Sequence, residues 1–465
     1  MTLHLPRTDS WPGRPAPATR SEPGPAADLQ GSAVELLRPF GGVDVSTEIY
    51  VGGLTLPEFP DPGEDDSGDH RVRHTAEDRP NTATLPPLAD PAADHLDAAV
   101  LARRQDVEAK HRRVVDYLAR SGREAVVLSR ADSLAWFTSG GDLGEAIGLE
   151  AGAVQLYINR HSRAVVADNV HSARVFEEEL AGLGFQLKER PWHEDPARVI
   201  DELAGTKRIA ADAGDRSTPE DRAALRALRW PLTGVERQRL RELGRSLTLA
   251  VEATCRNFQP GETEADVAGH LAHRLLREGI VPVDLRVAGD DRLARYRRPT
   301  FKAAEIKGRA TVCAVGRRQG ICASLTRTVS FGPVDLTFRD AHNLAAMVDA
   351  TCIYFSRPTE PVREVVRRAR RILEKFDHAD EWTLAELGHL IAYAPREGRL
   401  LPEGDDILAH GMALAWCPSV GPARSEDTVV VDDRGYEVVT EAQRWPKLEV
   451  VVKGYPLARP GILER

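Results

Sequence analysis

The sequence lacks the long apolar runs that cross membranes. No stretch has the length and hydrophobicity of a transmembrane helix, and no hydrophobic secretory segment stands at its start. Cysteine is also scarce: the five cysteines are an odd, scattered set, which is not the pattern of a disulfide framework. These features predict a protein of the reduced cytoplasm with no membrane partner.

An excess of positive charge is missing as well. The chain has 62 Lys and Arg against 71 Asp and Glu, a formal net charge of −9. Proteins that bind nucleic acids non-specifically need a basic surface to neutralise phosphates. The composition therefore predicts no nucleic-acid partner. With 42% hydrophobic and 29% charged residues in 465, the chain is long enough for two folded domains and a tail.

The first part of the chain, residues 1–94, lacks sustained apolar periodicity. It is rich in Pro, Ala, Gly and charged residues, as in WPGRPAPATRSEPGPAADLQG. Such segments bury too little apolar surface to offset the entropy lost on ordering. We expect a largely disordered extension, with residues 33–56 as a short element able to dock on the folded body.

Residues 95–231 predict a small α/β domain. An amphipathic helix begins near Leu96 and ends at Gly122. Segments with strand character follow at 124–129, 134–141, 154–158, 163–167 and 207–212, with a helical segment at 172–184. The turn at 139–142, SGGD, is more typical of plain turn chemistry than of a phosphate-binding or substrate-binding loop.

Residues 232–465 predict an α+β domain. Thr233 with Glu236, and Thr263 with Asp266, are capping boxes that open two successive helices. A hairpin follows at 311–331, then helices at 340–355 and 361–376, and then several strands. This order is typical of an antiparallel sheet backed by helices. His270 and His273 lie three residues apart on the second helix and are interpreted as solvated surface.

The ordered set of motifs in both domains resembles the pita-bread peptidase M24 superfamily, which includes aminopeptidase P, prolidase and creatinase. The resemblance rests on PGETEADVAGHLAHRLLREG, RYRRP, SLTRTVSFG, LGHLIAY, LAWCPS and SEDTVVV. It covers roughly residues 96–455. It implies a pita-bread C-terminal domain, a smaller creatinase-type α/β domain before it, and a homodimer.

The metallopeptidases of this family hold two metal ions with two Asp, one His and two Glu. The positions in this sequence that match them are Cys313, Ser324, His389, Cys417 and Glu426. The hairpin therefore lacks both aspartates, and only His389 and Glu426 keep the family's residue type. Two divalent cations held close together need bridging carboxylates to offset their repulsion. We therefore expect no dinuclear metal centre.

Creatinase, a metal-free member, uses a histidine upstream of the hairpin as acid and base. The matching segment here is Arg297-Arg298-Pro299, and a second family histidine, seven residues after the ligand histidine, is matched by Arg396. Arginine stays protonated and cannot act as a base, but it binds carboxylates bidentately. Arg298 and Arg396 are therefore predicted to bind substrate.

Three interpretations of the site remain open. In the first, His389 acts as acid and base with Glu426 or Glu397 as its partner carboxylate, in metal-free hydrolysis of a C–N bond of a small carboxylate-bearing or peptide-like substrate. In the second, the domain is an inactive pseudoenzyme that binds a peptide or protein partner, as metal-free pita-bread domains of histone chaperones do. In the third, His389, Cys417 and Glu426 hold a single zinc ion. A divergent creatinase-like hydrolase without a cofactor is the working hypothesis.

Overall fold

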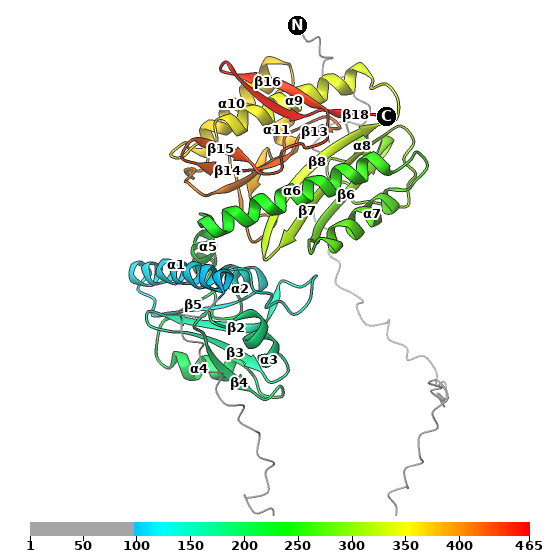
Figure 1. Ribbon diagram of the computed structural model, residues 1–465. Coiled ribbons are helices and arrows are strands. Elements are labelled where there is room, and N and C mark those ends of the chain that lie inside the picture. Colours follow the sequence, from blue (N-terminus) through cyan, green and yellow to red (C-terminus); the bar gives the residue numbers. More distant parts are fainter. Residues whose placement is uncertain (1–96) are drawn as a thin grey trace, which may run out of the picture. The chain divides into compact units, whose positions relative to one another are not determined.

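The structure is a computed structural model that describes residues 97–465 (Figure 1). The predicted extension, 1–94, and the docking element within it lie outside the described residues. Within residues 97–465, no helix combines the length and hydrophobicity needed to cross a bilayer. The division of the folded part near residue 231 remains a prediction.

The N-terminal part of the described chain contains one five-stranded mixed sheet, in the order β4-β3-β2-β1-β5. Its strands are β1 (Ala125–Arg130), β2 (Ala151–Asn159), β3 (Arg163–Asp168), β4 (Gln186–Arg190) and β5 (Ile209–Ala211). The other elements are α1 (Ala98–Ser121), α2 (Ala131–Phe137), α3 (Ser172–Arg174), the π-helix η3 (Val175–Glu179), α4 (Ala197–Ala204) and α5 (Pro219–Ala227).

The predicted boundaries of α1 are confirmed, since Gly122 ends the helix in the left-handed conformation with φ 68°. One segment differs from the prediction. Residues 134–141 were expected to have strand character, but α2 covers Ala131–Phe137. The burial of all five residues from Ser133 to Phe137 explains the mistake, because a short, fully buried apolar run has the same pattern in a helix and in a strand.

The C-terminal part begins with two capped helices over a four-stranded sheet, β18-β8-β7-β6. Both capping boxes are present, at the starts of α6 (Gly234–Asn257) and α7 (Glu264–Arg277). The sheet contains β6 (Val281–Gly289), the hairpin of β7 (Arg309–Arg318) and β8 (Ile321–Ser330), and β18 (Ile462–Glu464). The hairpin prediction is confirmed. Figure 1 shows α6 and α7 lying along this sheet, and both helices contact its strands.

Another five-stranded sheet, β10-β9-β11-β14-β15, lies next to the four-stranded sheet that contains β8. The single bridge between Thr326 of β8 and Glu426 joins the two sheets. The second sheet comprises β9 (Gly388–Leu390), β10 (Gly398–Arg399), β11 (Ala413–Trp416), β14 (Asp427–Asp432) and β15 (Gly435–Val438). Its helices are α9 (Leu336–Tyr354) and α10 (Val362–Lys375), which pack on each other.

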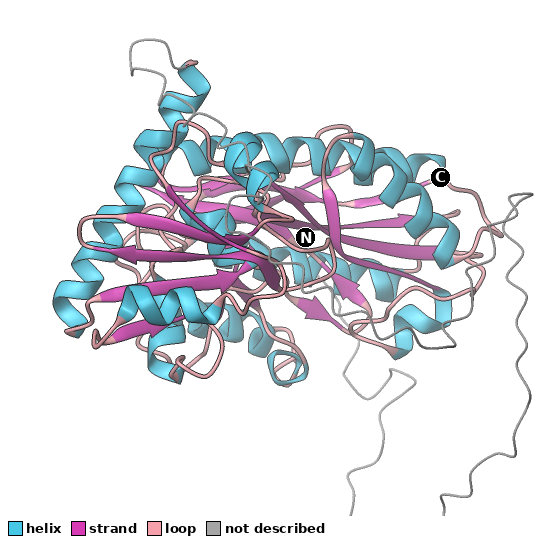
Figure 2. Ribbon diagram, turned by 90° about the horizontal axis from the view of Figure 1, so that it is seen from below, coloured by secondary structure: helices cyan, strands magenta, loops and turns pink. Residues whose placement is uncertain are grey.

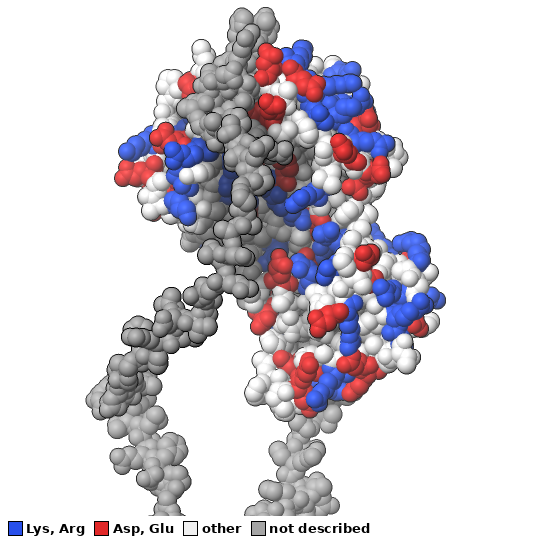
Figure 3. Space-filling model, turned by 180° about the vertical axis from the view of Figure 1, so that it is seen from behind, with Lys and Arg blue, Asp and Glu red and all other residues white. Residues whose placement is uncertain are grey.

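The remaining elements are short. They are α8 (Asp290–Arg295), α11 (Glu381–Leu384), the pair β12 (Ser419–Val420) and β13 (Ala423–Arg424), and the pair β16 (Lys447–Val452) and β17 (Tyr455–Pro460). Figure 2 shows the strands with helices flanking them. The predicted α+β, helix-backed architecture is confirmed. On the face shown in Figure 3, Lys and Arg are interspersed with Asp and Glu.

Candidate functional site

The five positions that match the family's metal ligands line one crevice at the junction of the two sheets. Cys313 and Ser324 come from the hairpin and His389 from β9, whereas Cys417 directly follows β11 and Glu426 directly precedes β14. Strand pairing fixes their approach: Ala415 lies opposite His389, and the Cys417 amide donates to the Leu387 carbonyl at 2.8 Å. Residues separated by more than 100 positions thus share one site.

Glu426 is enclosed by hydroxyl and thiol donors. Its Oε1 accepts a hydrogen bond from Ser324 Oγ, and its Oε2 accepts one from Thr326 Oγ1 at 2.5 Å and one from Cys313 Sγ at 3.4 Å. Burial raises the pKa of Glu426, but Arg424 and the two hydroxyl donors outweigh burial and lower it, so the group is ionised. Burial, reinforced by Glu426, raises the pKa of Cys313, which keeps its thiol proton for donation.

A second cluster forms around Glu386, a residue that the sequence did not indicate. Its Oε1 lies 2.5 Å from Arg298 Nη2, 2.6 Å from Arg396 Nη1 and 3.3 Å from His389 Nδ1. A single carboxylate oxygen thus holds the two predicted substrate-binding arginines and the predicted acid–base histidine. Glu386 precedes His389 by three residues in the connection after α11, and this spacing alone carries no distinctive signal.

The Glu386 cluster is ionic at neutral pH. Burial lowers the pKa of His389, but the neighbouring Cys417 and Glu386 outweigh burial and raise it to about 10. Burial raises the pKa of Glu386, but His389 and Arg298 outweigh it and lower that pKa to about 2. His389 is therefore an imidazolium at neutral pH, ready to give a proton rather than to accept one.

Cys417 completes this cluster. Glu386, His389 and Cys417 each offer one atom that could bind a metal ion, and these three atoms lie within 4.8 Å of one another. The zinc interpretation named Glu426 as the carboxylate beside His389 and Cys417, whereas Glu386 is the acid grouped with them here. The Glu426 oxygens are directed to Ser324, Thr326 and Cys313 instead.

Glu397 lies outside the crevice, which corrects its predicted role as a partner of His389. Its carboxylate is fully buried, forms an ion pair with Arg229 at 2.7 Å, and accepts hydrogen bonds from the Tyr393 and Ala394 amides, each at 3.0 Å. Desolvation dominates at this depth, which raises the pKa of Glu397. Glu397 therefore has a structural role between Arg229 and the turn at 393–397.

The crevice is small and rich in arginine. Its volume is about 20 Å³, enough for one water molecule. Its lining includes four arginines and two acids, namely Arg286, Arg298, Arg396, Arg424, Asp284 and Glu426. A neighbouring hollow of about 30 Å³ shares Arg286, Arg298 and Arg424 with it and adds Arg297. The local field therefore favours an anion.

The residues present do not fit the dinuclear metal centre of the family. That centre uses four carboxylates. In this chain two of them are replaced by cysteine and one by serine. Both oxygens of the fourth, Glu426, accept hydrogen bonds from side chains. Four arginines in the lining would also repel divalent cations. The single zinc ion predicted for His389, Cys417 and Glu426 stays a prediction.

A larger cavity, of about 770 Å³, lies between the turn at 139–142 and the tip of the β7–β8 hairpin. The turn's amides already have partners: Gly140 N donates to Ala135 O, Gly141 N to Thr138 Oγ1, and Asp142 N to Glu179 Oε2. They are not free to hold a phosphate, in agreement with the plain-turn interpretation. The charges lining the cavity are balanced, with Arg103, Arg174, Arg317 and Arg318 against Asp132, Asp142, Glu145 and Glu179.

Gly388 fixes the strand that carries His389. A Cβ added there would lie 2.5 Å from Trp416 Cε3 and 2.9 Å from Ala415 O. We expect Gly388→Ala to lower the free energy of unfolding by about 1–3 kcal/mol, because the added methyl overpacks a closed strand pair. Urea unfolding followed by circular dichroism measures this. Gly269→Ala, on α7 with open space around it, is the control and should not destabilise the protein. Equal stability of Gly388→Ala and wild type would contradict the prediction.

Comparison with known proteins agrees with this architecture. Residues 238–433 match the model of metallopeptidase family M24. A curated relative, an uncharacterized peptidase of Staphylococcus aureus (strain MW2), is 22% identical over 218 residues, which are 45% of this chain and 62% of the relative. The chain therefore spans about three fifths of that relative's length.

Two solved structures show the same fold over most of their length. The dipeptidase PepE of Mycobacterium ulcerans has a TM-score of 0.62 and 19% identity, and the match covers 80% of this chain and 100% of that one. The N-terminal domain of the FACT complex subunit SPT16 from chickpea (Cicer arietinum) has a TM-score of 0.56 and 12% identity, covering 75% and 98%. The match over residues 238–433 and the shared fold confirm the resemblance of this part of the chain to metallopeptidase family M24 and the pita-bread fold of the described residues.

Proposed function

We propose that this protein hydrolyses a C–N bond in a small, carboxylate-bearing, peptide-like substrate without a metal ion. The observation that carries the proposal is the convergence of Arg298, Arg396 and His389 on one carboxylate oxygen of Glu386. Three cationic donors that meet at one oxygen have the geometry for a substrate carboxylate. The match of residues 238–433 to a peptidase family supports hydrolysis as the reaction class.

Each residue has a distinct role in this proposal. Arg298 and Arg396 hold the substrate carboxylate, and Arg396, whose side chain is 43% exposed, meets it first. As a water molecule adds to the carbonyl carbon and the C–N bond breaks, His389, protonated at neutral pH, gives its proton to the leaving nitrogen and then takes up the proton that the water loses. Glu426 stays ionised within its hydroxyl donors and supplies the negative charge that favours the imidazolium.

A second candidate function is binding of a peptide or protein partner without chemistry. Two observations favour it: the crevice has room for one water molecule, and the structural neighbours include a subunit domain of the FACT complex as well as peptidases. In this alternative, Arg298 and Arg396 bind an acidic group of the partner. A homodimer, which the family resemblance implies, is compatible with both candidates.

The test is a thermal-shift screen against a dipeptide library, with product detection by mass spectrometry and metal content by inductively coupled plasma mass spectrometry. We expect carboxylate-terminated dipeptides to raise the melting temperature by a few degrees and their amidated forms to have no effect, since ligand binding stabilises the native state. Arg396→Gln should abolish the shift. Arg399→Gln, an exposed arginine three residues further on, should not.

The outcomes separate the candidates. Hydrolysis that persists in a chelator, from protein without bound metal, supports the proposal. A shift without any product supports the binding protein. Activity that a chelator removes and zinc restores, with about one zinc per chain that is lost in Cys417→Ala, would establish the zinc hydrolase instead.

A further inference from the structure

The two arginines that we propose bind the substrate carboxylate lie on loops rather than on strands. Arg298 follows α8 within the segment 289–302, and Arg396 lies in the turn at 393–397 between β9 and β10. Their guanidinium groups nevertheless meet at one oxygen of Glu386, at 2.5 Å and 2.6 Å. Loops are the more mobile parts of a fold, and a misplacement of about 1 Å in a site is costly. Other residues must therefore hold the backbone of both loops.

Glu397 holds the turn that carries Arg396. Its Oε1 accepts hydrogen bonds from the Tyr393 and Ala394 amides, both at 3.0 Å, and its Oε2 lies 2.7 Å from Arg229 Nη2. Glu397 and Arg229 are 0% and 3% exposed, so the turn is closed by a fully buried ion pair. Arg396 directly precedes this anchor in the chain, and its backbone position follows from it.

Glu264, in the first turn of α7, holds the segment 289–302 in the same way. Its Oε1 accepts a hydrogen bond from the Gly289 amide at 3.0 Å, and its Oε2 accepts one from the Lys302 amide at 2.9 Å. Arg292, within the segment, lies 3.0 Å from Glu264 Oε1. Both ends of the segment that carries the other arginine are therefore tied to one carboxylate.

Both anchors are charged groups at a depth where charge is costly. Glu264 is 1% exposed and Glu397 is 0% exposed. A buried ion pair contributes little net stability, because the desolvation of its two charges offsets their attraction. Its hydrogen bonds do fix geometry, since an ionised carboxylate accepts several strong, directed bonds. Binding groups keep a productive geometry only when the residues behind them are held in this manner.

We propose that Glu397 and Glu264 are positioning residues for the substrate carboxylate, Glu397 through Arg396 and Glu264 through Arg298. This inference rests on the proposed function and deepens it, because it assigns the residues that set the spacing of the two carboxylate-binding arginines. Each anchor holds a different loop. Loosening one anchor therefore displaces one arginine and leaves the other in place.

Arginine modification of the full chain tests the proposal without a substrate. Phenylglyoxal reacts with accessible guanidinium groups, and peptide mapping by mass spectrometry gives the rate at each arginine separately. We expect Glu397→Gln to raise the rate at Arg396 by about threefold or more, because local opening frees the guanidinium from its ion pair. Glu264→Gln should do the same at Arg298. In each variant the other arginine should keep its wild-type rate.

Glu252→Gln is the matched control. Glu252 is 0% exposed, and its carboxylate accepts hydrogen bonds from the Gln443 and Arg444 amides at 3.0 Å and 2.8 Å. None of the described residues that line the crevice lies on the loop that it holds. This variant should change neither modification rate, even where it lowers the melting temperature. Circular dichroism checks that each variant is folded, and Glu397→Asp or Glu264→Asp replaces a glutamine variant that is not.

Binding gives a second readout, which a merely structural role would not move. The ligand is the carboxylate-terminated dipeptide that gives the largest thermal shift in the library. Glu397→Gln and Glu264→Gln should each raise its dissociation constant by about tenfold, because the arginines no longer meet at the carboxylate. Glu252→Gln should leave the constant within about twofold of wild type, since it acts at a distant site.

The failures of the two proposals are distinguishable. Wild-type modification rates in both glutamine variants, or equal increases at both arginines that also occur in Glu252→Gln, would overturn the positioning roles. The carboxylate site would then stand on dipeptide binding by the wild type. If each variant frees its own arginine but no carboxylate-terminated dipeptide binds the wild type, the two anchors stand and the carboxylate site of the proposed function is overturned.

Discussion

Replacing Arg459 with methionine should lower the free energy of unfolding by about 3–5 kcal/mol, because it leaves the buried Asp349 without its cation and Asp427 with Arg327 alone. Arg459 is 1% exposed, and its Nη2 lies 2.6 Å from Asp349 Oδ2 and 2.6 Å from Asp427 Oδ2. Burial raises the pKa of Asp349 to about 6 even with Arg459 present. Guanidinium chloride unfolding, followed by fluorescence, measures the loss.

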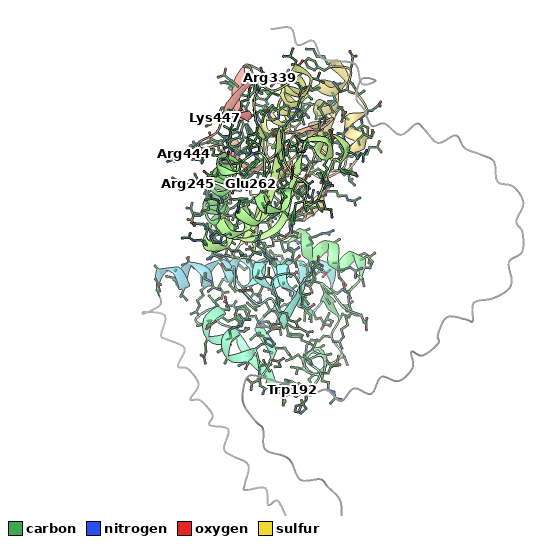
Figure 4. The ribbon with its side chains drawn as sticks, turned by 90° about the vertical axis from the view of Figure 1, so that its right-hand side faces the viewer. Trp192, Arg245, Glu262, Arg339, Arg444 and Lys447 are labelled. Carbon is green, nitrogen blue, oxygen red and sulfur yellow. The ribbon has the colours of Figure 1, made fainter. Side chains whose placement is uncertain are left out.

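The matched control is Arg245→Met on α6, whose exposed side chain Figure 4 labels at the surface. Its effect should stay within about 0.5 kcal/mol. The double variant Asp349→Leu/Arg459→Met should lose less than the sum of its single variants, because it removes an acid together with the cation. A loss below 1 kcal/mol in Arg459→Met would show that the ion cluster contributes little to stability.

The triple variant Cys313→Asp, Ser324→Asp, Cys417→Glu should convert the crevice into a metal-binding site. It places carboxylates at the positions that match the family's ligands and adds three negative charges beside His389 and Glu426. Bridging carboxylates offset the repulsion between two divalent cations. After incubation with Mn²⁺ and desalting, we expect between one and two metal ions per chain by plasma mass spectrometry, against background levels in wild type.

The control for this variant also carries His389→Ala, which removes the imidazole ligand and should reduce the metal content. Wild-type protein treated in the same way sets the background. Metal content at background in the triple variant would show that the arginines of the crevice, rather than the missing carboxylates, exclude metal. Binding without hydrolysis of dipeptides would separate metal binding from catalysis.

The sequence predicted those parts of the fold that depend on local signals. The capping boxes of Thr233 and Thr263 indicate where α6 and α7 begin. Gly122 indicates where α1 ends, because the backbone conformation there favours glycine. The β7–β8 hairpin follows from two apolar runs around a Gly-rich turn. Strand β6 was missed, although Val281, Val283, Leu285 and Val287 alternate along it.

Site residues could be predicted from the sequence only at positions that match the family's motifs. His389, Arg298 and Arg396 were expected near one another, and the structure brings them together on Glu386, a residue 88 positions from Arg298. No local pattern marks such a contact. For Glu397 the prediction was wrong. It is adjacent to Arg396 in sequence, but it forms an ion pair with Arg229, 168 positions away. Both cases are set by tertiary ion pairing, which a single sequence does not display.

The last segments of the described chain impose an order on biosynthesis. Strand β17 delivers Arg459 between Asp349 and Asp427, and β18 adds to β8 in parallel, with Ile462 opposite Thr328. Until the ribosome has made and released these residues, the two acids lack Arg459 and β8 has an open edge. We therefore expect this domain to complete its folding only once β17 and β18 have emerged from the ribosome, with chaperones covering the nascent edge in the meantime.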